Sequence, residues 1–209
     1  MIKNILFDLG GVIMTLSHPD GVKRFKELGV KDAEKQLDPY TQTGIFGDLE
    51  EGKITAEEFR LALGEMVGRE VSFAECKHCW LGYRADLPMR NLDALKQLRK
   101  EGYRLILLSN TNPFMMDWAE SEEFDGMGHS IHHYFDATYM SYRVKTLKPS
   151  EYFFSYVLEK EGIKPEETLF VDDGPRNVAM AAEMGIHTFC PENGEDWTAK
   201  IFDFLMNNE

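Results

Sequence analysis

The sequence predicts an α/β fold, in which a Rossmann-like, mostly parallel sheet carries an inserted, all-helical cap domain. Through the last two thirds of the chain, short apolar runs alternate with amphipathic helical segments, as in sheets built from strand–helix–strand units. The stretch between the first apolar run and this region shows helical spacing without a strong strand pattern. We therefore expect residues 1–14 and 88–209 to form the sheet domain and residues 15–87 to form the cap.

Five short apolar runs are the expected strands. The first run ends in a carboxylate and two glycines, in the segment ILFDLGG at residues 5–11. The other four cover residues 103–108, 137–140, 168–171 and 186–190, and the run at 137–140 is the weakest of them. Parallel strands are buried on both faces, and for this reason they read as continuous apolar runs.

Apolar residues at helical spacing predict the helices. In the sheet domain the helices cover residues 91–100, 148–161, 177–184 and 196–206. In the cap they cover residues 21–28, 32–37, 56–67 and 73–83. Two capping signals support these assignments. Thr55 precedes a helix with Glu58 three residues later, and Pro149 falls near the first turn of its helix.

The chain is strongly acidic, with a formal net charge of −13 over 209 residues. This charge argues against nucleic acid and anionic membrane surfaces as partners, because both would be repelled. No apolar run approaches the ~20 residues that span a bilayer and no signal peptide is recognisable, so we expect a cytoplasmic protein. An anionic substrate would also be repelled, so a phosphate site needs a metal ion and nearby lysines. The acidic runs at 48–51 and 120–125 are expected to be solvated surface.

Two clusters have the composition of metal sites, but their spacing favours structural roles. Cys76 and Cys79 are separated like zinc ligands yet lack a second pair, and Cys76 shares helical spacing with Trp80. We therefore expect Cys76 in the core, with reduced thiols in a chain of three cysteines. The histidines at 129–133 could form a second cluster, although we expect them to flank Tyr134 at a helix end.

Asp8 is the first candidate for chemistry. It follows an apolar run directly and precedes glycines that let the backbone turn tightly. A carboxylate at the carboxyl end of a central parallel strand is a candidate nucleophile, because ligands of open α/β sheets bind at that edge. On this segment alone, a strand that ends in a polar turn explains the pattern equally well.

Two more segments place polar groups near expected strand and helix ends. Ser109 and Asn110 follow the run at 103–108, and a hydroxyl with the next amides can hold an anionic oxygen. Lys148 precedes a predicted helix and could offer a point charge to a phosphate and a carboxylate. Each has an ordinary alternative, since a serine after a strand is usually a helix cap and most lysines lie on the surface.

The pair Asp172-Asp173 is more specific. Two adjacent carboxylates at the end of a buried strand repel each other and lose hydration, and a divalent cation removes this cost. Oxygen ligands suit Mg²⁺, which keeps waters and prefers one or two carboxylates plus phosphate oxygen. A helix-capping turn is the alternative, but one acid would suffice for it. We therefore expect a metal at Asp172 and Asp173, at the same sheet edge as Asp8 and Ser109.

Together, the segments around Asp8, Ser109, Lys148 and Asp172-Asp173 resemble the four motifs of the haloacid dehalogenase superfamily of aspartate-nucleophile hydrolases. The resemblance covers essentially the whole chain, and the helical insertion resembles the family's α-helical C1-type cap. The Phe-Asp-Leu-Gly start and the double aspartate are similar to the branch that contains a bacterial α-glucose-1-phosphate phosphatase.

The resemblance implies a nucleophile and a metal site. Asp8 would attack phosphorus and form an aspartyl-phosphate. Asp8 and the backbone carbonyl of Gly10 would bind Mg²⁺. Asp173 would be a direct ligand, and Asp172 would act through a metal-bound water. These roles are physically sensible, because phosphoryl transfer rewards positioning and charge neutralisation.

The resemblance also implies a phosphate site. Ser109 and the Asn110 amide would hold phosphoryl oxygens, and Lys148 would balance the charge of Asp8 and the phosphate. The expected activity is therefore Mg²⁺-dependent hydrolysis of a small phosphomonoester, with a sugar phosphate as one candidate substrate.

One position departs from the family pattern. Most phosphatases of the family carry a second aspartate two residues after the nucleophile, where this chain has Gly10. That aspartate protonates the leaving group, so general acid–base help of about 10²–10⁴-fold is put in doubt. His18 could replace it, although an exposed hinge histidine is the simpler interpretation. Residues Glu50, Glu51 and Gly52 fall in an expected cap loop that could face the site.

Two other functions stay open. Dehalogenases of the same family also lack the second aspartate, but they work without metal and do not need the acid pair Asp172-Asp173. A protein that kept the fold could also be a catalytically weak phosphate-binding or regulatory module. The sequence sets neither the natural substrate nor the oligomeric state.

Overall fold

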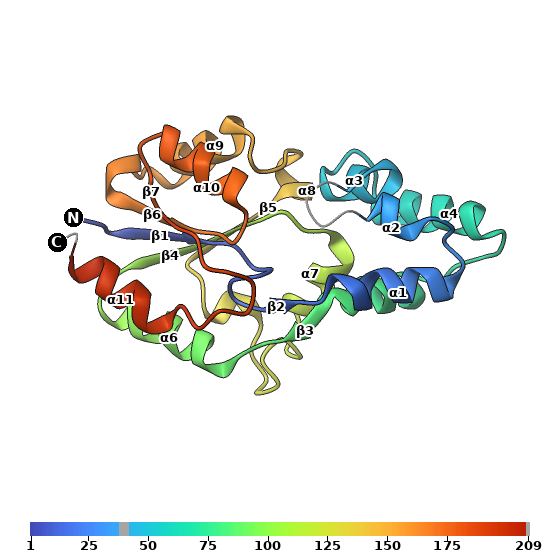
Figure 1. Ribbon diagram of the computed structural model, residues 1–209, viewed down its shortest axis with the longest axis horizontal. Helices are drawn as coiled ribbons and strands as arrows, with labels where there is room; N and C mark the ends of the chain where they lie inside the picture. Colours follow the sequence, from blue (N-terminus) through green and yellow to red (C-terminus); the bar gives the residue numbers. More distant parts are fainter. Residues whose placement is uncertain (38–41, 208–209) are drawn as a thin grey trace.

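The computed structural model describes residues 1–37 and 42–207, and it contains a five-stranded sheet with helices on both faces (Figure 1). The strands are β1 (Asn4–Phe7), β4 (Arg104–Ser109), β5 (Ala137–Met140), β6 (Thr168–Val171) and β7 (His187–Phe189). They lie in the order β5-β4-β1-β6-β7, and all neighbours pair in parallel. The five predicted strands and the α/β fold class are thus confirmed.

Alternating side chains divide the core of the sheet domain into two layers. In β1, Ile5 and Phe7 belong to one apolar cluster and Leu6 to the other, and all three are fully buried. Since β1 is the central strand, both of its faces are covered, which explains the unbroken apolar run. The strand can therefore place a side chain at its carboxyl end with little freedom of position.

The four helices predicted for the sheet domain are present. They are α6 (Met89–Lys100), α9 (Glu151–Glu161), α10 (Pro175–Glu183) and α11 (Thr198–Met206), with α9 and α10 on one face and α6 and α11 on the other (Figure 1). Helix α9 begins at Glu151 and not at residue 148, because a residue before proline disfavours helical backbone. Among the described residues, no helix combines the length and the apolar character needed to cross a membrane.

Three short helices are missing from the prediction. They are α3 (Gly44–Glu50), α7 (Pro113–Ala119) and α8 (Ser141–Val144). Helices this short complete two turns or fewer, so apolar periodicity does not reveal them. Only α7 has a clear local start signal, because the Asn112 side chain accepts hydrogen bonds from two backbone N–H groups and Pro113 follows. The described residues also contain the 3₁₀ turns η1 (Leu81–Tyr83), η2 (Ile131–His133) and η3 (Pro165–Glu167).

The helical cap lies beyond the carboxyl ends of the strands (Figure 1). Besides α3, it contains α1 (His18–Leu28), α2 (Ala33–Gln36), α4 (Ala56–Val67) and α5 (Phe73–Trp80). Its interior is aromatic, with the rings of Phe25, Phe46, Phe59 and Trp80 packed at centroid distances of 5.1 to 6.1 Å. Large rings bury much apolar area per residue, which suits a small helical unit.

Two short strands close the base of the cap. β2 (Thr15–Leu16) pairs antiparallel with β3 (Arg84–Asp86), although the sequence pattern predicts no strand between residues 14 and 87. Strands of two and three residues are too short to show alternation, so this part of the prediction is wrong. The pairing brings the chain that enters the cap beside the chain that leaves it.

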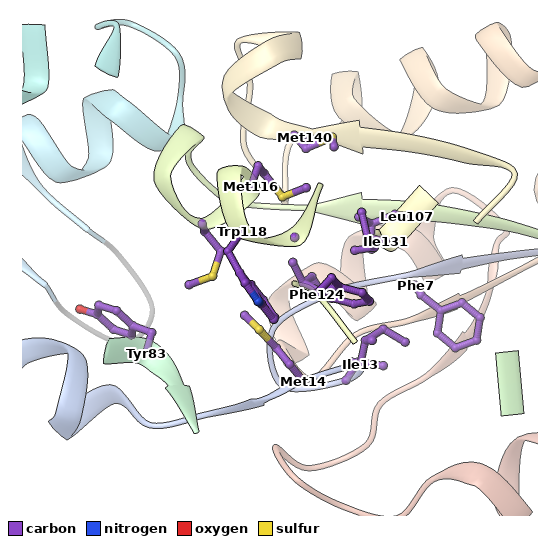
Figure 2. Packing of buried hydrophobic residues seen from close by; sticks show 14 of the residues in the cluster. Phe7, Ile13, Met14, Tyr83, Leu107, Met116, Trp118, Phe124, Ile131 and Met140 are labelled. Atoms are coloured by element: carbon purple, nitrogen blue, oxygen red, sulfur yellow. The ribbon is translucent and has the colours of Figure 1, made fainter. Parts of the chain in front are cut away.

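One apolar cluster continues from the sheet into the cap. Figure 2 shows it running from Phe7 in the sheet, past Trp118 of α7, to Tyr83 on the side of the cap. The two parts of the chain thus share packed side chains as well as two covalent connections. The domain boundaries at 1–14, 15–87 and 88–209 stay predictions, and they include residues 38–41 and 208–209, outside the described chain.

Two carboxylates of the acidic runs at 48–51 and 120–125 are not solvated surface groups, so the expectation of a solvated surface is wrong for them. Glu50 is half-buried, and the Asp125 carboxylate is fully buried. Asp125 accepts hydrogen bonds from the Tyr134 hydroxyl at 2.6 Å and the Met127 N–H at 2.7 Å, and it pairs with His129 at 2.8 Å. Although burial opposes ionisation, these bonds hold the pKa of Asp125 well below its ordinary value.

The cysteines and histidines that resemble metal sites have structural surroundings. Cys76 is fully buried, as predicted, and burial raises the pKa of its thiol to about 12. His129 stacks on His133 at a centroid distance of 4.1 Å, next to Tyr134. In the described chain, neither set belongs to a group of three or more side chains placed to share a metal.

Gly52 sets how closely the cap approaches the sheet domain. Its φ is +71°, and a Cβ there would lie 2.1 Å from the carbonyl oxygen of Tyr142 in α8. We predict that Gly52→Ala lowers the free energy of unfolding by about 2–4 kcal/mol, because backbone must move to relieve the overlap. Urea denaturation measures this loss.

Gly68→Ala is the matched control. Gly68 has a φ of +74°, but nothing lies within 4 Å of the position of its Cβ. Only the strain of left-handed backbone remains, so the expected loss is about 1 kcal/mol. Equal losses for the two variants would contradict a close approach at Gly52.

Candidate active site

Residues far apart in the sequence meet around Asp8 at the carboxyl edge of the sheet. Asp8 follows β1, Ser109 ends β4, and Asp172 follows β6. Ser109 Oγ donates a hydrogen bond to Asp8 Oδ1 over 2.7 Å, and Lys148 Nζ lies 3.2 Å from Asp8 Oδ2. This is the edge at which open parallel sheets bind ligands.

Lys148 is a buried cation that bridges two carboxylates. Its Nζ lies 2.5 Å from Asp172 Oδ2 and donates to the Leu108 carbonyl at 2.9 Å. The Asn110 side chain holds the backbone of Lys148, accepting from its N–H at 2.8 Å and donating to its carbonyl at 3.0 Å. Burial opposes the charge, but Asp172 and Asp8 outweigh it and raise the pKa of Lys148. The alternative of a surface lysine is therefore wrong.

Near pH 7, the Asp8 carboxyl group is divided between its neutral and its ionised form. Burial raises its pKa to about 7, and the charges of Asp172 and Asp173 act in the same direction. Lys148 and the hydrogen bond from Ser109 oppose this rise. A carboxylate nucleophile must be ionised, so added positive charge at this edge would favour the reactive form.

The two adjacent aspartates have different surroundings. Asp172 is fully buried, and its Oδ1 accepts from the Gly174 N–H at 2.7 Å and from the Asn177 amide at 3.0 Å. Asp173 forms no ion pair with a cation in the described chain, and burial next to Asp172 raises its pKa to about 6. Asp172 is thus occupied by protein groups, while Asp173 has a carboxylate available for a ligand.

Three carboxylates at this edge fit a hard divalent cation. One oxygen each from Asp8, Asp172 and Asp173 lies within 4.8 Å of the others. Their mutual repulsion is a cost that a cation would remove, and oxygen donors suit Mg²⁺. Gly11 permits the crowding, because its φ is +79° and a Cβ there would lie 2.1 Å from Asp173 Oδ2.

The position of the missing second aspartate borders an apolar side chain. A Cβ on Gly10 would lie 2.9 Å from Leu16 Cδ1. Leu16 is fixed in turn by Asn193, which accepts from the Leu16 N–H at 2.9 Å and donates to its carbonyl at 3.0 Å. The chain has no side-chain carboxylate at position 10, and the space beside Gly10 holds Leu16.

A cavity of about 750 Å³ is lined by both the sheet edge and the cap. The sheet domain contributes Asp8, Ser109, Asn110, Lys148 and Asp173, and the cap contributes His18, Gln42, Glu50, Trp80 and Tyr83. The alternative role of His18 as a replacement acid gains little support, because its Nε2 contacts the Leu37 carbonyl. His18 is half-buried, so the simpler interpretation, an exposed hinge residue, is wrong about its exposure.

Glu50 is the cap carboxylate that lines this cavity. It ends helix α3, so its expected place in a loop is wrong, but the expectation that it faces the site is confirmed. Burial raises its pKa to about 7 and the charge of Asp8 adds to this, while a hydrogen bond from the Asn112 side chain opposes it. Glu51 instead pairs with Lys53 at 2.7 Å.

Sequence reasoning missed several residues of the site. Asn112 and Asn177 belong to it only through their neighbours in space. Leu16 is different, because the sequence places the segment 14–18 just past Asp8 as a candidate for substrate contact, and Met14, Leu16 and His18 line the cavity. Asn112 has a detectable local signal, since Asn followed by Pro is typical of a helix start. Asn177 lacks such a signal, because an amide in a first helical turn is common.

Lys148→Met tests the buried pair, because it keeps the length of the side chain but leaves Asp172 without its cation. We predict a loss of about 3–5 kcal/mol in the free energy of unfolding at neutral pH. Lys200→Met breaks an exposed pair with Glu195 and should cost at most about 1 kcal/mol. Guanidinium denaturation compares the two variants, and similar small losses would show that Lys148 is not needed to compensate buried charge.

Comparisons with known proteins agree with this geometry. The haloacid dehalogenase-like hydrolase family matches residues 2–185. A D-ribitol-5-phosphate phosphatase from Bacteroides thetaiotaomicron is 47% identical over 201 residues, which cover 96% of this chain and 97% of that protein.

Two solved structures extend the likeness to the fold. One is a predicted HAD-like family hydrolase from Porphyromonas gingivalis, with a TM-score of 0.93, 43% identity and 98% of each chain covered. The other is a HAD family enzyme from Bacteroides thetaiotaomicron in complex with magnesium and inorganic phosphate. It has a TM-score of 0.87 and 39% identity, and the match covers 96% of this chain and 99% of that one. The chain belongs to the haloacid dehalogenase-like hydrolase family.

Proposed function

We propose that this protein is a Mg²⁺-dependent phosphatase that hydrolyses a small phosphomonoester through an aspartyl-phosphate on Asp8. One observation carries the proposal: a carboxylate nucleophile, a buried lysine and two further carboxylates gather at one sheet edge. The relatives support it, because one is named as a phosphatase and another binds magnesium and phosphate. The resemblance to the glucose-1-phosphate phosphatase branch stays a prediction.

Asp8 is the proposed nucleophile. An oxygen of its carboxylate attacks phosphorus, the bond from phosphorus to the leaving oxygen breaks, and the leaving oxygen takes up a proton from water. Lys148, 3.2 Å from Asp8, neutralises charge as the phosphoryl group transfers. Ser109 and the Asn110 amide hold phosphoryl oxygens. Water then attacks phosphorus, which releases phosphate and restores Asp8.

The proposed direct ligands of Mg²⁺ are Asp8, Asp173 and the Gly10 carbonyl. Asp172 would act through a bound water. When bound, the ion supplies positive charge that favours ionised Asp8 and neutralises phosphate oxygens. The difference between the two aspartates supports this division, since Asp172 already accepts from Lys148, Gly174 and Asn177. Asp172 also orients Lys148, and this role is independent of metal.

The cap, proposed to cover residues 15–87, closes the catalytic edge from the other side. A cavity of about 750 Å³ is of the size that holds a small metabolite. Excluding water from it strengthens the electrostatic interactions around the phosphate. A soluble sugar phosphate or related polyol phosphate is the proposed substrate class, in line with the D-ribitol-5-phosphate phosphatase relative. A cytoplasmic location and the absence of nucleic-acid or membrane partners stay predictions.

A metal-independent dehalogenase is less well supported. Lys148 and Ser109 would serve both reactions, but the cluster of Asp8, Asp172 and Asp173 adds negative charge that a metal-free anion site would not tolerate well. Turnover of chloroacetate in EDTA would select the dehalogenase. Binding of beryllium fluoride without phosphate release from a broad panel of esters would select a regulatory module.

Asp8→Asn tests the nucleophile. We predict that kcat falls by at least about 10³-fold with a panel of sugar phosphates and p-nitrophenyl phosphate, because an amide cannot form the intermediate. Phosphate release in the presence of Mg²⁺ and of EDTA is the measurement, and circular dichroism checks the fold. Asp93→Asn, on an exposed face of α6, is the control and should keep full activity. Normal turnover by Asp8→Asn would end the proposal.

Asp173→Asn separates metal binding from folding. The folded-state pKa of Asp173, about 6, lies above its ordinary value of 3.8, so the folded protein loses stability as pH rises through this range. We predict that the variant stabilises the metal-free protein by about 1–3 kcal/mol near pH 8, and that the gain fades toward pH 4.

Thermal unfolding with and without Mg²⁺ completes this test. Saturating Mg²⁺ should raise the Tm of the wild-type protein and leave that of Asp173→Asn unchanged. An equal rise in both proteins would place the ion away from Asp173.

A further inference from the structure

One carboxyl group in the cavity has no part in the reaction described so far. The titratable side chains that line the cavity, within the described residues, are those of Asp8, His18, Glu50, Tyr83, Lys148, Asp173 and Arg176. Asp8, Lys148 and Asp173 already have roles as nucleophile, charge-balancing cation and metal ligand. The reaction still needs a group that protonates the leaving oxygen, because position 10 offers no carboxylate.

Three of the remaining side chains are poor general acids near neutral pH. The Arg176 guanidinium keeps its proton under all ordinary conditions. Burial raises the pKa of the Tyr83 hydroxyl, so it gives up its proton even less readily than a free phenol. The Nε2 atom of His18 contacts the Leu37 carbonyl and is therefore already engaged. Glu50 is the side chain that is left.

Glu50 can hold and release a proton near neutral pH. Burial raises its pKa to about 7, and the charge of Asp8 acts in the same direction. Glu50 is also the last residue of α3, where the negative end of the helix dipole disfavours a carboxylate. A general acid is most effective when its pKa lies near the working pH, because it must be protonated and still give its proton up.

Asn112 holds the Glu50 carboxyl group from the side of the sheet domain. Asn112 is 2% exposed and lies in the loop that follows Ser109. Its Oδ1 accepts from the N–H groups of Phe114 at 3.2 Å and Met115 at 3.1 Å. The amide nitrogen is therefore free to donate to Glu50. This hydrogen bond stabilises the carboxylate that remains once the proton has been given up.

Glu50 lies on the side of the cavity from which a leaving group departs. In phosphoryl transfer the attacking and leaving oxygens lie roughly in line across phosphorus, so the leaving oxygen points away from Asp8. The cap lies beyond the carboxyl ends of the strands (Figure 1), and Glu50 is the carboxyl group that it contributes to the cavity lining. In the turn after α3, the close approach of Gly52 to the Tyr142 carbonyl keeps this part of the cap near the sheet domain.

We propose that Glu50 is the general acid that protonates the leaving oxygen. This assignment rests on the proposed phosphatase function. As the bond from phosphorus to the leaving oxygen breaks, the Glu50 carboxyl group gives its proton to that oxygen and becomes a carboxylate. It takes a proton back from the water that attacks the aspartyl-phosphate on Asp8. The proton on the released alcohol therefore comes from water in each cycle, with Glu50 as its carrier.

Glu50→Gln tests the proposal, because the amide keeps the volume and an acceptor for Asn112 but cannot supply a proton. Benzyl, phenyl and p-nitrophenyl phosphate are similar in size, but p-nitrophenol leaves readily as an anion whereas benzyl alcohol needs a proton. With Mg²⁺ present, we expect kcat/KM to fall by about 10²–10⁴-fold for benzyl phosphate and by less than about 3-fold for p-nitrophenyl phosphate. Phenyl phosphate should lie between them. The ratio kcat/KM is compared because it reports the steps up to release of the alcohol.

Glu51→Gln is the matched control, since Glu51 pairs with Lys53 at 2.7 Å and does not line the cavity. It should leave all three values of kcat/KM unchanged. An equal loss on the three esters in Glu50→Gln, or no loss, would overturn the proposal. A wild-type protein that prefers p-nitrophenyl over benzyl phosphate by more than about 10³-fold would also overturn it, because such a protein has no effective general acid. Failure of the wild-type protein to hydrolyse any of the esters would instead reject the phosphatase function itself.

Discussion

The buried contact of Lys148 with Asp8 and Asp172 is the interaction on which the rest of the site depends. Three carboxylates within 4.8 Å of one another would strongly disfavour ionisation without a nearby cation. Lys148 provides that cation from a position 3.2 Å from Asp8 and 2.5 Å from Asp172. It does not neutralise the whole cluster, because burial and mutual repulsion still raise the pKa of Asp8 to about 7. The remaining negative charge would favour a divalent cation at this edge, and in the proposed function that cation would offset the charge of a phosphate.

The cap completes the site with a different chemistry. The sheet edge around Asp8 is charged and anionic, whereas the cap side of the cavity is lined by Trp80 and Tyr83, with Glu50 as its acid. Leu16 at the base of the cap lies beside Gly10, where a Cβ would come within 2.9 Å of Leu16 Cδ1. The base of the cap is therefore packed against the position at which the family pattern has its second aspartate. Proton donation to the leaving group must therefore come from another group or from water.

Features of the fold and the site that follow from a local sequence pattern could be predicted, whereas features that depend on contacts between distant residues could not. The strands were predictable because each is a continuous apolar run, and the meeting of Asp8, Ser109 and Asp172 follows from parallel strands sharing one edge. The helix α4 was predictable to the residue because Thr55 and Glu58 form a capping box. Strand β2 and helix α3 were not, because they are too short to show a periodic pattern. The burial of Glu50 was not predictable either, because it depends on contacts between the cap and the sheet domain. The same holds for Tyr83, whose place in the cavity lining appears only once the cavity is known.

A crystal structure of the protein with Mg²⁺ and beryllium fluoride tests the central claim most directly, because beryllium fluoride mimics a phosphoryl group on a carboxylate. The account predicts beryllium bonded to an Asp8 oxygen, with Mg²⁺ on Asp8, Asp173 and the Gly10 carbonyl and with Lys148 still bonded to Asp172. Beryllium fluoride bound away from Asp8, or an ion that displaces Lys148 from Asp172, would contradict it.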